Sequence, residues 1–257
     1  MFNLKNKTVF ITGASSGIGK ACAEVFAESG ANLILSARRV DKIKELADRL
    51  STEFNIEVFA GRMDVQKRKE IDQFVNELPD NFKKTDILVN NAGLALGVTE
   101  FYNDDPDGWD TMIDTNIKGL LYTTHKIVPL MMKEGAGHVI NLGSIAGHQA
   151  YPKGSVYCAT KHAVKAITRS LRMDLLDQGI RVSSVDPGMV ETEFSEVRFR
   201  GDKDKASDVY KGIEPLVARD IAEAILFCAT RPPHANINEM VIMPSAQANA
   251  FITHRKD

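Results

Sequence analysis

The stretch Thr8-Val-Phe-Ile-Thr-Gly-Ala-Ser-Ser-Gly-Ile-Gly19 sets the architecture of the chain. Its first five residues are rich in β-branched and aromatic side chains, which predicts a short buried strand. Apolar residues at helical spacing begin at Ile18, and Gly30 ends that pattern, which predicts a helix. Glycines between a strand and a helix let the backbone approach a phosphate, whose charge the first helical N–H groups bind. We therefore expect residues 13–19 to hold a dinucleotide; a plain tight turn is the alternative.

Short apolar runs alternate with amphipathic segments along the rest of the chain. Including the first, strands are predicted at residues 8–12, 32–36, 56–60, 86–90, 138–142, 181–185 and 239–243. Helices are predicted between them, at about residues 42–50, 67–78, 107–132, 155–176 and 218–228. Because crossovers between parallel strands are right-handed, this order predicts one α/β Rossmann-type domain over residues 1–257. Its parallel seven-stranded, doubly wound sheet would carry helices on both faces.

Small and polar residues gather where the predicted strands end. Ligands of doubly wound sheets bind beyond these carboxyl ends, so the residues there are candidates for contact with the cofactor. An ordinary Asn-Gly turn is the alternative for residues 90–93. The candidates, with those of the first turn, are Gly13, Ser15, Ser16, Gly17, Ile18, Gly19, Asp64, Val65, Asn91, Ala92, Gly93, Pro187, Gly188, Val190 and Thr192.

Arg38 and Arg39 follow the second predicted strand, where an enzyme that uses NAD usually carries an acid for the ribose 2′-hydroxyl. Guanidinium groups suit the 2′-phosphate of NADP. The nearest acid, Asp41, stands where the next helix should begin and is expected to cap it. The sequence therefore favours NADP over NAD, and a solvated surface turn is the alternative role of the two arginines.

Tyr157 and Lys161 stand four residues apart in Ser155-Val-Tyr-Cys-Ala-Thr-Lys161. In a helix both side chains lie on one face, and a lysine cation beside a phenol lowers the pKa of that phenol. Such an acid suits proton exchange with a carbonyl or hydroxyl oxygen. A partly exposed amphipathic helix is the alternative. Asn116, with Gly119 three residues later, predicts a kink in the long helix, or else a polar contact in the core.

Composition excludes several classes of function. The net charge of −2 gives no electrostatic case for binding nucleic acid or an anionic membrane. The three cysteines are far apart, and the six histidines show no metal-binding spacing, so we expect a reducing cytoplasm and no metal. No apolar run approaches the length of a membrane span, and residues 1–7 have no apolar core of a secretion signal.

Residues 189–217 are rich in charge and lack strong periodicity. A long segment of this kind after a strand is more often functional than a spacer, so we expect a substrate lid within the domain. Residues 244–257 form a C-terminal tail.

Over nearly its full length the sequence resembles the short-chain dehydrogenase/reductase family. The motifs that carry the resemblance are Thr12-Gly13-x-x-x-Gly17-x-Gly19, Asn90-Asn91-Ala92-Gly93, Asn116, Ser144, Tyr157-x-x-x-Lys161 and Pro187-Gly188. The resemblance implies that Tyr157 is the general acid/base and that Lys161 tunes it and binds the cofactor ribose. It implies further that Ser144 donates a hydrogen bond to the substrate oxygen and that Asn116 anchors a proton relay through water.

A narrower resemblance, over Glu193–Asp202, Pro232–Asn238 and Met243-Pro244, is to NADP-dependent 3-hydroxy acid dehydrogenases. It implies a homotetramer that acts on L-serine, 3-hydroxyisobutyrate or 3-hydroxypropionate. Arginine can hold a carboxylate with two hydrogen bonds, so Arg198 and Arg200 are candidates to bind the substrate with Ser144 and Tyr157, and Lys153 is a third cation.

Two other functions stay open at this stage. One is a broad-specificity NADPH carbonyl reductase for ketones, steroids or 3-oxoacyl thioesters. The other is a non-catalytic regulator that senses NADP, although loss of the tyrosine, lysine or serine would have supported it better. The sequence leaves open the substrate, its stereochemistry, the direction of flux and the choice between dimer and tetramer.

Overall fold

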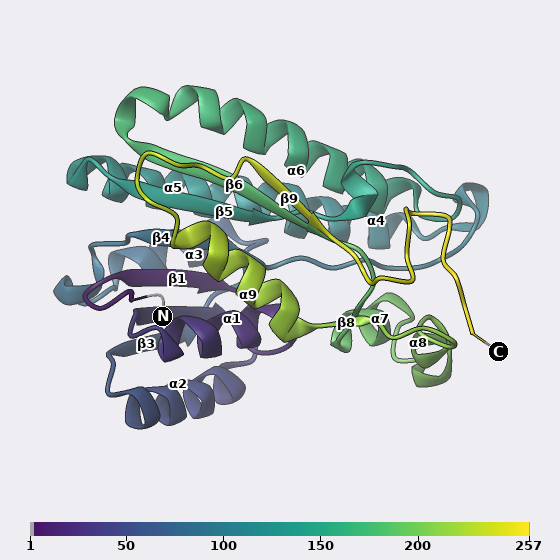
Figure 1. Ribbon diagram of the computed structural model, residues 1–257, viewed down its shortest axis with the longest axis horizontal. Helices are drawn as coiled ribbons and strands as arrows, with labels where there is room; N and C mark the ends of the chain where they lie inside the picture. Colours follow the sequence, from purple (N-terminus) through teal and green to yellow (C-terminus); the bar gives the residue numbers. More distant parts are fainter. Residues whose placement is uncertain (1–2, 257) are drawn as a thin grey trace.

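Parallel strands form a central sheet in the order β3-β2-β1-β4-β5-β6-β9 (Figure 1). The computed structural model describes residues 3–256, so Met1, Phe2 and Asp257, which belong to the N-terminal stretch and the tail considered above, lie outside the described residues. The order reverses between β1 and β4, which opens a crevice at the carboxyl ends of these two strands. The strands are β1 (Thr8–Thr12), β2 (Asn32–Ala37), β3 (Val58–Arg62), β4 (Ile87–Asn90), β5 (Gly137–Leu142), β6 (Ile180–Pro187) and β9 (Glu239–Ile242).

The predicted seven-stranded sheet is confirmed, although several strand ends differ from the predicted bounds. The third strand runs over Val58–Arg62 instead of residues 56–60. Helix α2 (Val40–Phe54) continues to Phe54 and ends at Asn55, whose φ of 50° is left-handed. Because the residues after Asn55 lead the chain back to the sheet, the third strand begins only at Val58.

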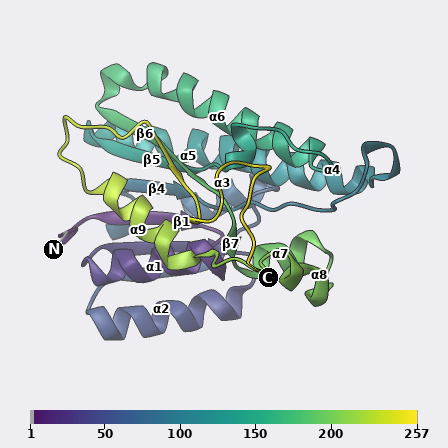
Figure 2. The same ribbon diagram turned by 45° about the vertical axis from the view of Figure 1, so that its right-hand side comes forward.

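Helices cover both faces of the sheet (Figures 1 and 2). Side chains alternate along each strand, so Val9 and Ile11 pack on one face while Phe10 packs on the other. The first face is covered by α1 (Gly17–Glu28), α2 and α9 (Ala218–Ala229). The second face is covered by α3 (Arg68–Asn76), α5 (Leu120–Glu134) and α6 (Ser155–Asp174).

The long helix expected over residues 107–132 is divided by a π-helical turn. It begins as α4 (Pro106–Ile113), widens in η3 (Asp114–Gly119) and continues as α5. Asn116 lies within the widened turn. Short 3-10 turns occur at η1 (Asp80–Phe82), η2 (Phe101–Asn103), η4 (Ile145–Gly147) and η5 (Leu176–Gln178).

Residues 189–217 lie beyond the carboxyl ends of the strands and form small elements of their own (Figure 1). Residues 244–256 return against this segment, where the Lys256 N–H donates to the Gly212 carbonyl at 2.7 Å. On the other side, the Gln247 side chain accepts from the Met189 N–H at 2.9 Å. The elements of the segment are β7 (Val190–Glu191), α7 (Glu193–Arg198), α8 (Lys203–Asp208) and β8 (Leu216–Val217).

Cys22, Cys158 and Cys228 are free thiols inside the fold. Among the helices of residues 3–256, none combines the length and the apolar character that crossing a membrane would need.

Candidate active site

The turn after β1 is a tight cradle built from glycines. Gly13 and Gly17 have left-handed φ values of 68° and 52°. A Cβ atom at Gly19 would lie 2.4 Å from both the Gly13 carbonyl oxygen and Asn91 Nδ2, so a larger residue would disrupt the turn. Asn91 Nδ2 donates to the Thr12 carbonyl at 2.8 Å, which ties the turn to the loop after β4. This backbone turn at the N-terminus of α1 fits the pyrophosphate of a dinucleotide.

Cations cluster beside this turn at the end of β2. Arg39 Nε donates to Ser15 Oγ at 3.1 Å, and another guanidinium nitrogen donates to Ser16 Oγ. The same guanidinium pairs with Glu193 at 2.7 Å, and Lys42 lies 3.6 Å from that carboxylate. The two serine hydroxyls, together with the cations Arg39 and Lys42, suit a 2′-phosphate.

The structure corrects the role expected for Asp41. Helix α2 begins at Val40, and its N-cap is Arg39. Asp41 therefore lies inside the first turn, where a carboxylate interacts favourably with the helix dipole instead of capping the helix.

A cavity of about 460 Å³ lies beyond the carboxyl ends of the strands. Four candidates from the sequence, Gly19, Asn116, Lys153 and Arg200, do not line it. The candidates that do are Gly13, Ser15, Ser16, Gly17, Ile18, Arg38, Arg39, Asp64, Val65, Asn91, Ala92, Gly93, Ser144, Tyr157, Lys161, Pro187, Gly188, Val190, Thr192 and Arg198. The fold thus gathers residues that are spread over 185 positions of the chain, from Gly13 to Arg198, around one space.

Asn116 acts behind the cavity wall. Its side-chain amide both donates to the Leu94 carbonyl at 2.8 Å and accepts from the Leu94 N–H at 2.9 Å. It also donates to Thr160 Oγ1 on helix α6 at 3.0 Å. The side chain therefore makes the polar core contact that was the alternative in the sequence, and it fixes α6 against the loop after β4.

Tyr157 is buried, and the groups around it shift its pKa in opposite directions. Burial raises the pKa of its phenol well above the usual value, and Tyr151 nearby adds to that rise. A hydrogen bond with Ser144 and the positive charge of Arg198 act in the opposite direction. Ser144 is itself held by the Ala146 N–H, which donates to its hydroxyl oxygen at 3.1 Å.

Lys161 points past the Tyr157 ring toward the sheet. Its Nζ donates to the Leu142 carbonyl at 2.8 Å and lies 6.0 Å from the centre of the Tyr157 ring. Burial lowers the pKa of Lys161 to about 8. The expectation that Lys161 depresses the Tyr157 pKa is not met in this structure, because desolvation of the phenolate outweighs the charges near it.

Among the cations of residues 189–217, Arg198 lies beside Tyr157. Its guanidinium carbon lies 5.5 Å from the centre of the Tyr151 ring and 5.8 Å from that of Tyr157. Within the described residues its buried Nε has no hydrogen-bond partner, and its side chain forms no ion pair with an acid. By contrast, Arg200 pairs with Asp105 on the surface, and Lys153 pairs with Glu100 at 3.1 Å.

Several residues that line the cavity had little or no signal in the sequence. Tyr151 stands in the run 148–153, and nothing in that run indicates its contact with Arg198. Phe194 packs against Tyr157 with ring centres 5.7 Å apart. Gln247 comes from the C-terminal tail, and only the return of that tail places it in the wall.

Comparison with known proteins places the chain in a family. The family model described as short chain dehydrogenase matches residues 7–203. The chain belongs to this family. Short chain dehydrogenases with known activities include a 44% identical relative from Schizosaccharomyces pombe, an NADP-dependent 3-hydroxy acid dehydrogenase, matched over 100% of this chain and 99% of the relative.

Two further relatives extend the comparison. Sulfoacetaldehyde reductase 2 of Chromohalobacter salexigens is 45% identical over 96% of this chain and 98% of its own length. The solved closed form of a serine dehydrogenase complexed with NADP+ shares 39% of its sequence with this short chain dehydrogenase. It superposes with a TM-score of 0.91 over 97% of this chain and 100% of that one.

Proposed function

We propose that this short chain dehydrogenase transfers a hydride between NADP and the hydroxyl-bearing carbon of short 3-hydroxy acids. The observation that carries the proposal is the position of Arg198, which faces the cavity beside Tyr157 with a buried N–H that no described residue satisfies. A buried donor without a partner is costly, and a bound anion would satisfy it.

The cofactor end of the cavity supports NADP. Arg38, Arg39 and two serine hydroxyls lie beside the glycine turn, where a 2′-phosphate would follow the pyrophosphate. The relatives named for NADP agree with this assignment. Glu193 at present neutralises part of the Arg39 charge, so cofactor binding would draw Arg39 away from that carboxylate.

The chain's own residues would carry the proton chemistry. Tyr157 takes the hydroxyl proton during oxidation and returns it during reduction, while Ser144 donates a hydrogen bond to the same oxygen. The positive charge of Arg198 near the ring offsets part of the cost of a buried phenolate. The nicotinamide, when bound, accepts or supplies the hydride. Asn116, in the π turn, would anchor a water that carries the proton onward.

Residues 189–217 would act as a lid over the substrate. Their helix α7 carries Glu193 at its start, Phe194 against Tyr157, and Arg198 at its end. One short helix therefore touches the cofactor end, the reacting end and the anion site of the cavity. A closed lid would exclude water and bring Arg198 onto the substrate carboxylate.

A second substrate class has support from one relative. Sulfoacetaldehyde reductase 2 is 45% identical to this chain. A guanidinium binds a sulfonate through the same N–H groups that bind a carboxylate. A short aldehyde that ends in a sulfonate is therefore the second candidate, and it uses the same anion site at Arg198.

Replacement of Arg198 tests the proposal. Charge-assisted hydrogen bonds contribute about 1.5–3 kcal/mol, so Arg198→Ala should raise KM for L-serine by about 10- to 100-fold. The dissociation constant for NADP should stay unchanged. Arg200→Ala is the matched variant, because it removes the same charge from the same segment outside the cavity. Steady-state kinetics with saturating NADP would contradict the proposal if both variants kept the parental KM.

We further propose a homotetramer. Strand β9 forms one edge of the sheet and exposes Val241, and helix α9 exposes Phe227. Met173 and Leu176 are exposed at the end of α6. Exposed apolar side chains on an edge strand and on neighbouring helices suit contacts between copies of the chain.

A further inference from the structure

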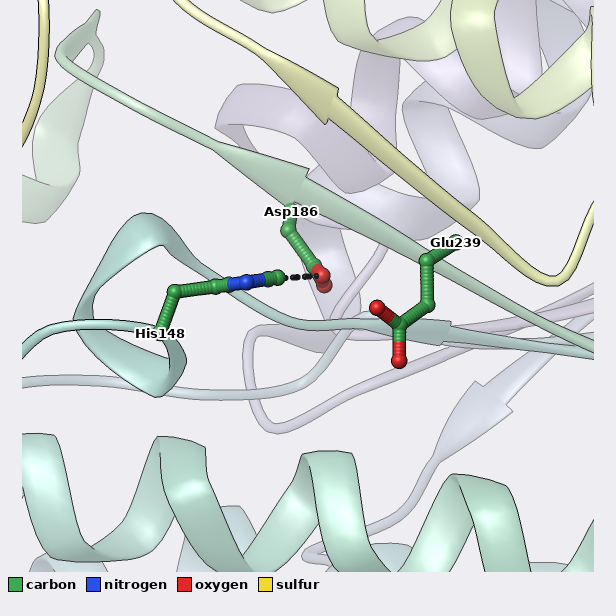
Figure 3. A group of neighbouring side chains, drawn as sticks. All are labelled: His148, Asp186 and Glu239. Atoms are coloured by element: carbon green, nitrogen blue, oxygen red, sulfur yellow. Dashed lines mark hydrogen bonds and ion pairs between the residues drawn. The ribbon is translucent and has the colours of Figure 1, made fainter.

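A second group of titratable side chains lies outside the candidate active site. His148, Asp186 and Glu239 come from the loop after η4, from β6 and from β9, and their ligand atoms lie within 4.8 Å of one another (Figure 3). Lys165 on α6 joins them, with Nζ 2.7 Å from His148 Nδ1 and 3.7 Å from a Glu239 oxygen. The ammonium group thus supplies the positive charge that a metal would otherwise bring.

The hydrogen bonds of this group fix the state of His148. The Lys165 ammonium has only protons to donate, so His148 Nδ1 must accept from it. The proton of the neutral ring then resides on Nε2, which donates to an Asp186 oxygen at 2.6 Å. The other Asp186 oxygen accepts from the Ser184 hydroxyl. Both oxygens of Asp186 therefore accept a hydrogen bond, which fixes the orientation of its side chain.

The fold places this carboxylate next to Lys161. Lys161 Nζ donates to the carbonyl of Leu142, the last residue of β5, and Gly143 follows directly. A Cβ atom on Gly143 would lie 1.8 Å from an Asp186 oxygen, so only glycine leaves room for the carboxylate here. The Gly143 N–H donates to the Val185 carbonyl at 2.9 Å, which keeps the ends of the two strands together.

We propose that Asp186, held in place by His148, is a positioning residue whose negative charge stabilises the Lys161 ammonium at the ends of β5 and β6. The inference rests on the proposed function and on the role that the family resemblance implies for Lys161, as a ligand of the cofactor ribose. Asp186 itself touches neither substrate nor reacting atoms, and its effect is electrostatic.

The charges that face the pair support this assignment. Burial lowers the pKa of Lys161 to about 8, and the Asp186 charge is the influence that opposes this fall. Lys161 also faces Tyr157 on its own helix and the loop after β4, where a Cβ at Gly93 would lie 3.8 Å from Nζ. On the far side of Asp186, Lys165 faces Glu239, and Arg169 Nε donates to Glu239 at 2.8 Å. Acids and bases alternate outward from Lys161 to the surface.

The sign of the effect follows from these charges. A nearby carboxylate stabilises an ammonium, so loss of the Asp186 charge should let Lys161 release its proton at lower pH. As the pH rises, NADPH affinity should then begin to fall at a lower pH than in the parent. A Tyr157→Phe parent removes the titration of the phenol and prevents turnover, so binding alone is measured.

The test is the NADPH dissociation constant between pH 7 and 10, followed by the fluorescence of the reduced nicotinamide. In Tyr157→Phe the affinity should weaken near pH 8, as Lys161 loses its proton. Asp186→Asn in the same parent should move this midpoint down by about one pH unit. Glu239→Gln, the control from the outer end of the cluster, should leave it in place. An identical midpoint with and without the Asp186 carboxylate overturns the inference.

If circular dichroism shows that Asp186→Asn does not fold, two variants of His148 provide an independent test. His148→Ala should lower the midpoint, because Asp186 can then turn toward Lys165. His148→Gln, which keeps a donor, should recover part of that shift. If both variants match the parent, or if the parent shows no weakening above pH 8, the inference fails. The measurement needs no substrate, so its failure is distinct from failure of the proposed activity.

Discussion

At the scale of single residues, Tyr157 depends on its surroundings more than its spacing from Lys161 suggested. Four residues of helix predicted a tyrosine and a lysine on one face, and α6 provides that arrangement. No pattern in the sequence indicates how deeply the phenol is buried, and burial governs its pKa. Phe194 and Tyr151, which help to bury it, come from segments that have no fixed distance from Tyr157 in the chain.

Tyr157→Phe should reduce turnover by at least about 100-fold, because general acid/base catalysis contributes a factor of that order or more. NADP binding should persist, since the ring and its packing remain. Tyr102→Phe removes a phenol from a side chain that is 81% exposed and should leave turnover unaltered. Substantial turnover by Tyr157→Phe in a steady-state assay would remove the tyrosine from the mechanism.

The different environments of Arg198 and Arg200 could not be predicted from the sequence. Two arginines two positions apart in a charged segment are equivalent in the sequence. In the structure Arg198 ends helix α7 facing the cavity, whereas Arg200 has a left-handed φ of 54° that turns the chain outward to Asp105. The left-handed backbone at Arg200 thus gives the two arginines different environments. No pattern in the sequence predicts that conformation.

At the scale of elements, the π turn in η3 is the feature that the sequence predicted only in outline. Asn116 and Gly119 indicated a kink, but the choice of a π turn depends on what lies beside it. A Cβ atom on Gly119 would lie 2.7 Å from Val65 Cγ2, so the close approach of the loop after β3 requires glycine. The turn therefore joins the cavity wall at Val65 to the helix that follows.

Gly119→Ala should destabilise the protein by about 1–3 kcal/mol, the usual cost of forcing a methyl group into a packed contact. Gly108→Ala, in the preceding helix, places its methyl at ordinary contact distances of 3.5 Å or more. That variant should stay within about 1 kcal/mol of the parent. Calorimetric Tm values compare the two, and an undiminished Tm for Gly119→Ala would contradict the close contact.

The helices of residues 189–217 could not be read from periodicity. Both α7 and α8 have 6 residues, less than two turns, which is too short for an apolar repeat. Their caps were visible in principle, because Thr192 accepts from the Phe194 N–H and Asp202 accepts from the Lys205 N–H. Cap residues alone do not establish that a helix follows.

At the scale of the whole molecule, the alternation of strands and helices was sufficient for the fold. Parallel strands with right-handed crossovers leave few topologies, and polar residues at the strand ends indicated the active edge. The course of residues 244–256 was not predictable. It depends on backbone contacts such as Lys256 to Gly212, which carry no side-chain signature.

Assembly is a prediction at the same scale. Light scattering after size-exclusion chromatography should give four times the mass of the chain. Replacing Val241 on the edge strand with glutamate should lower that mass, because a charge on the exposed strand opposes contact between copies. A monomeric parent would contradict the tetramer while leaving the active site as described.

We propose that the enzyme acts on short substrates that end in an anion. This is tested by comparing kcat/KM, with NADP, for 3-hydroxypropionate and for 1-propanol, which lacks only the carboxylate and its contacts. A site that clamps the anion at Arg198 should favour the acid by at least ~100-fold. The preference should largely vanish in Arg198→Ala. Comparable values for the two substrates in the unaltered enzyme would contradict the claim and favour a broad carbonyl reductase.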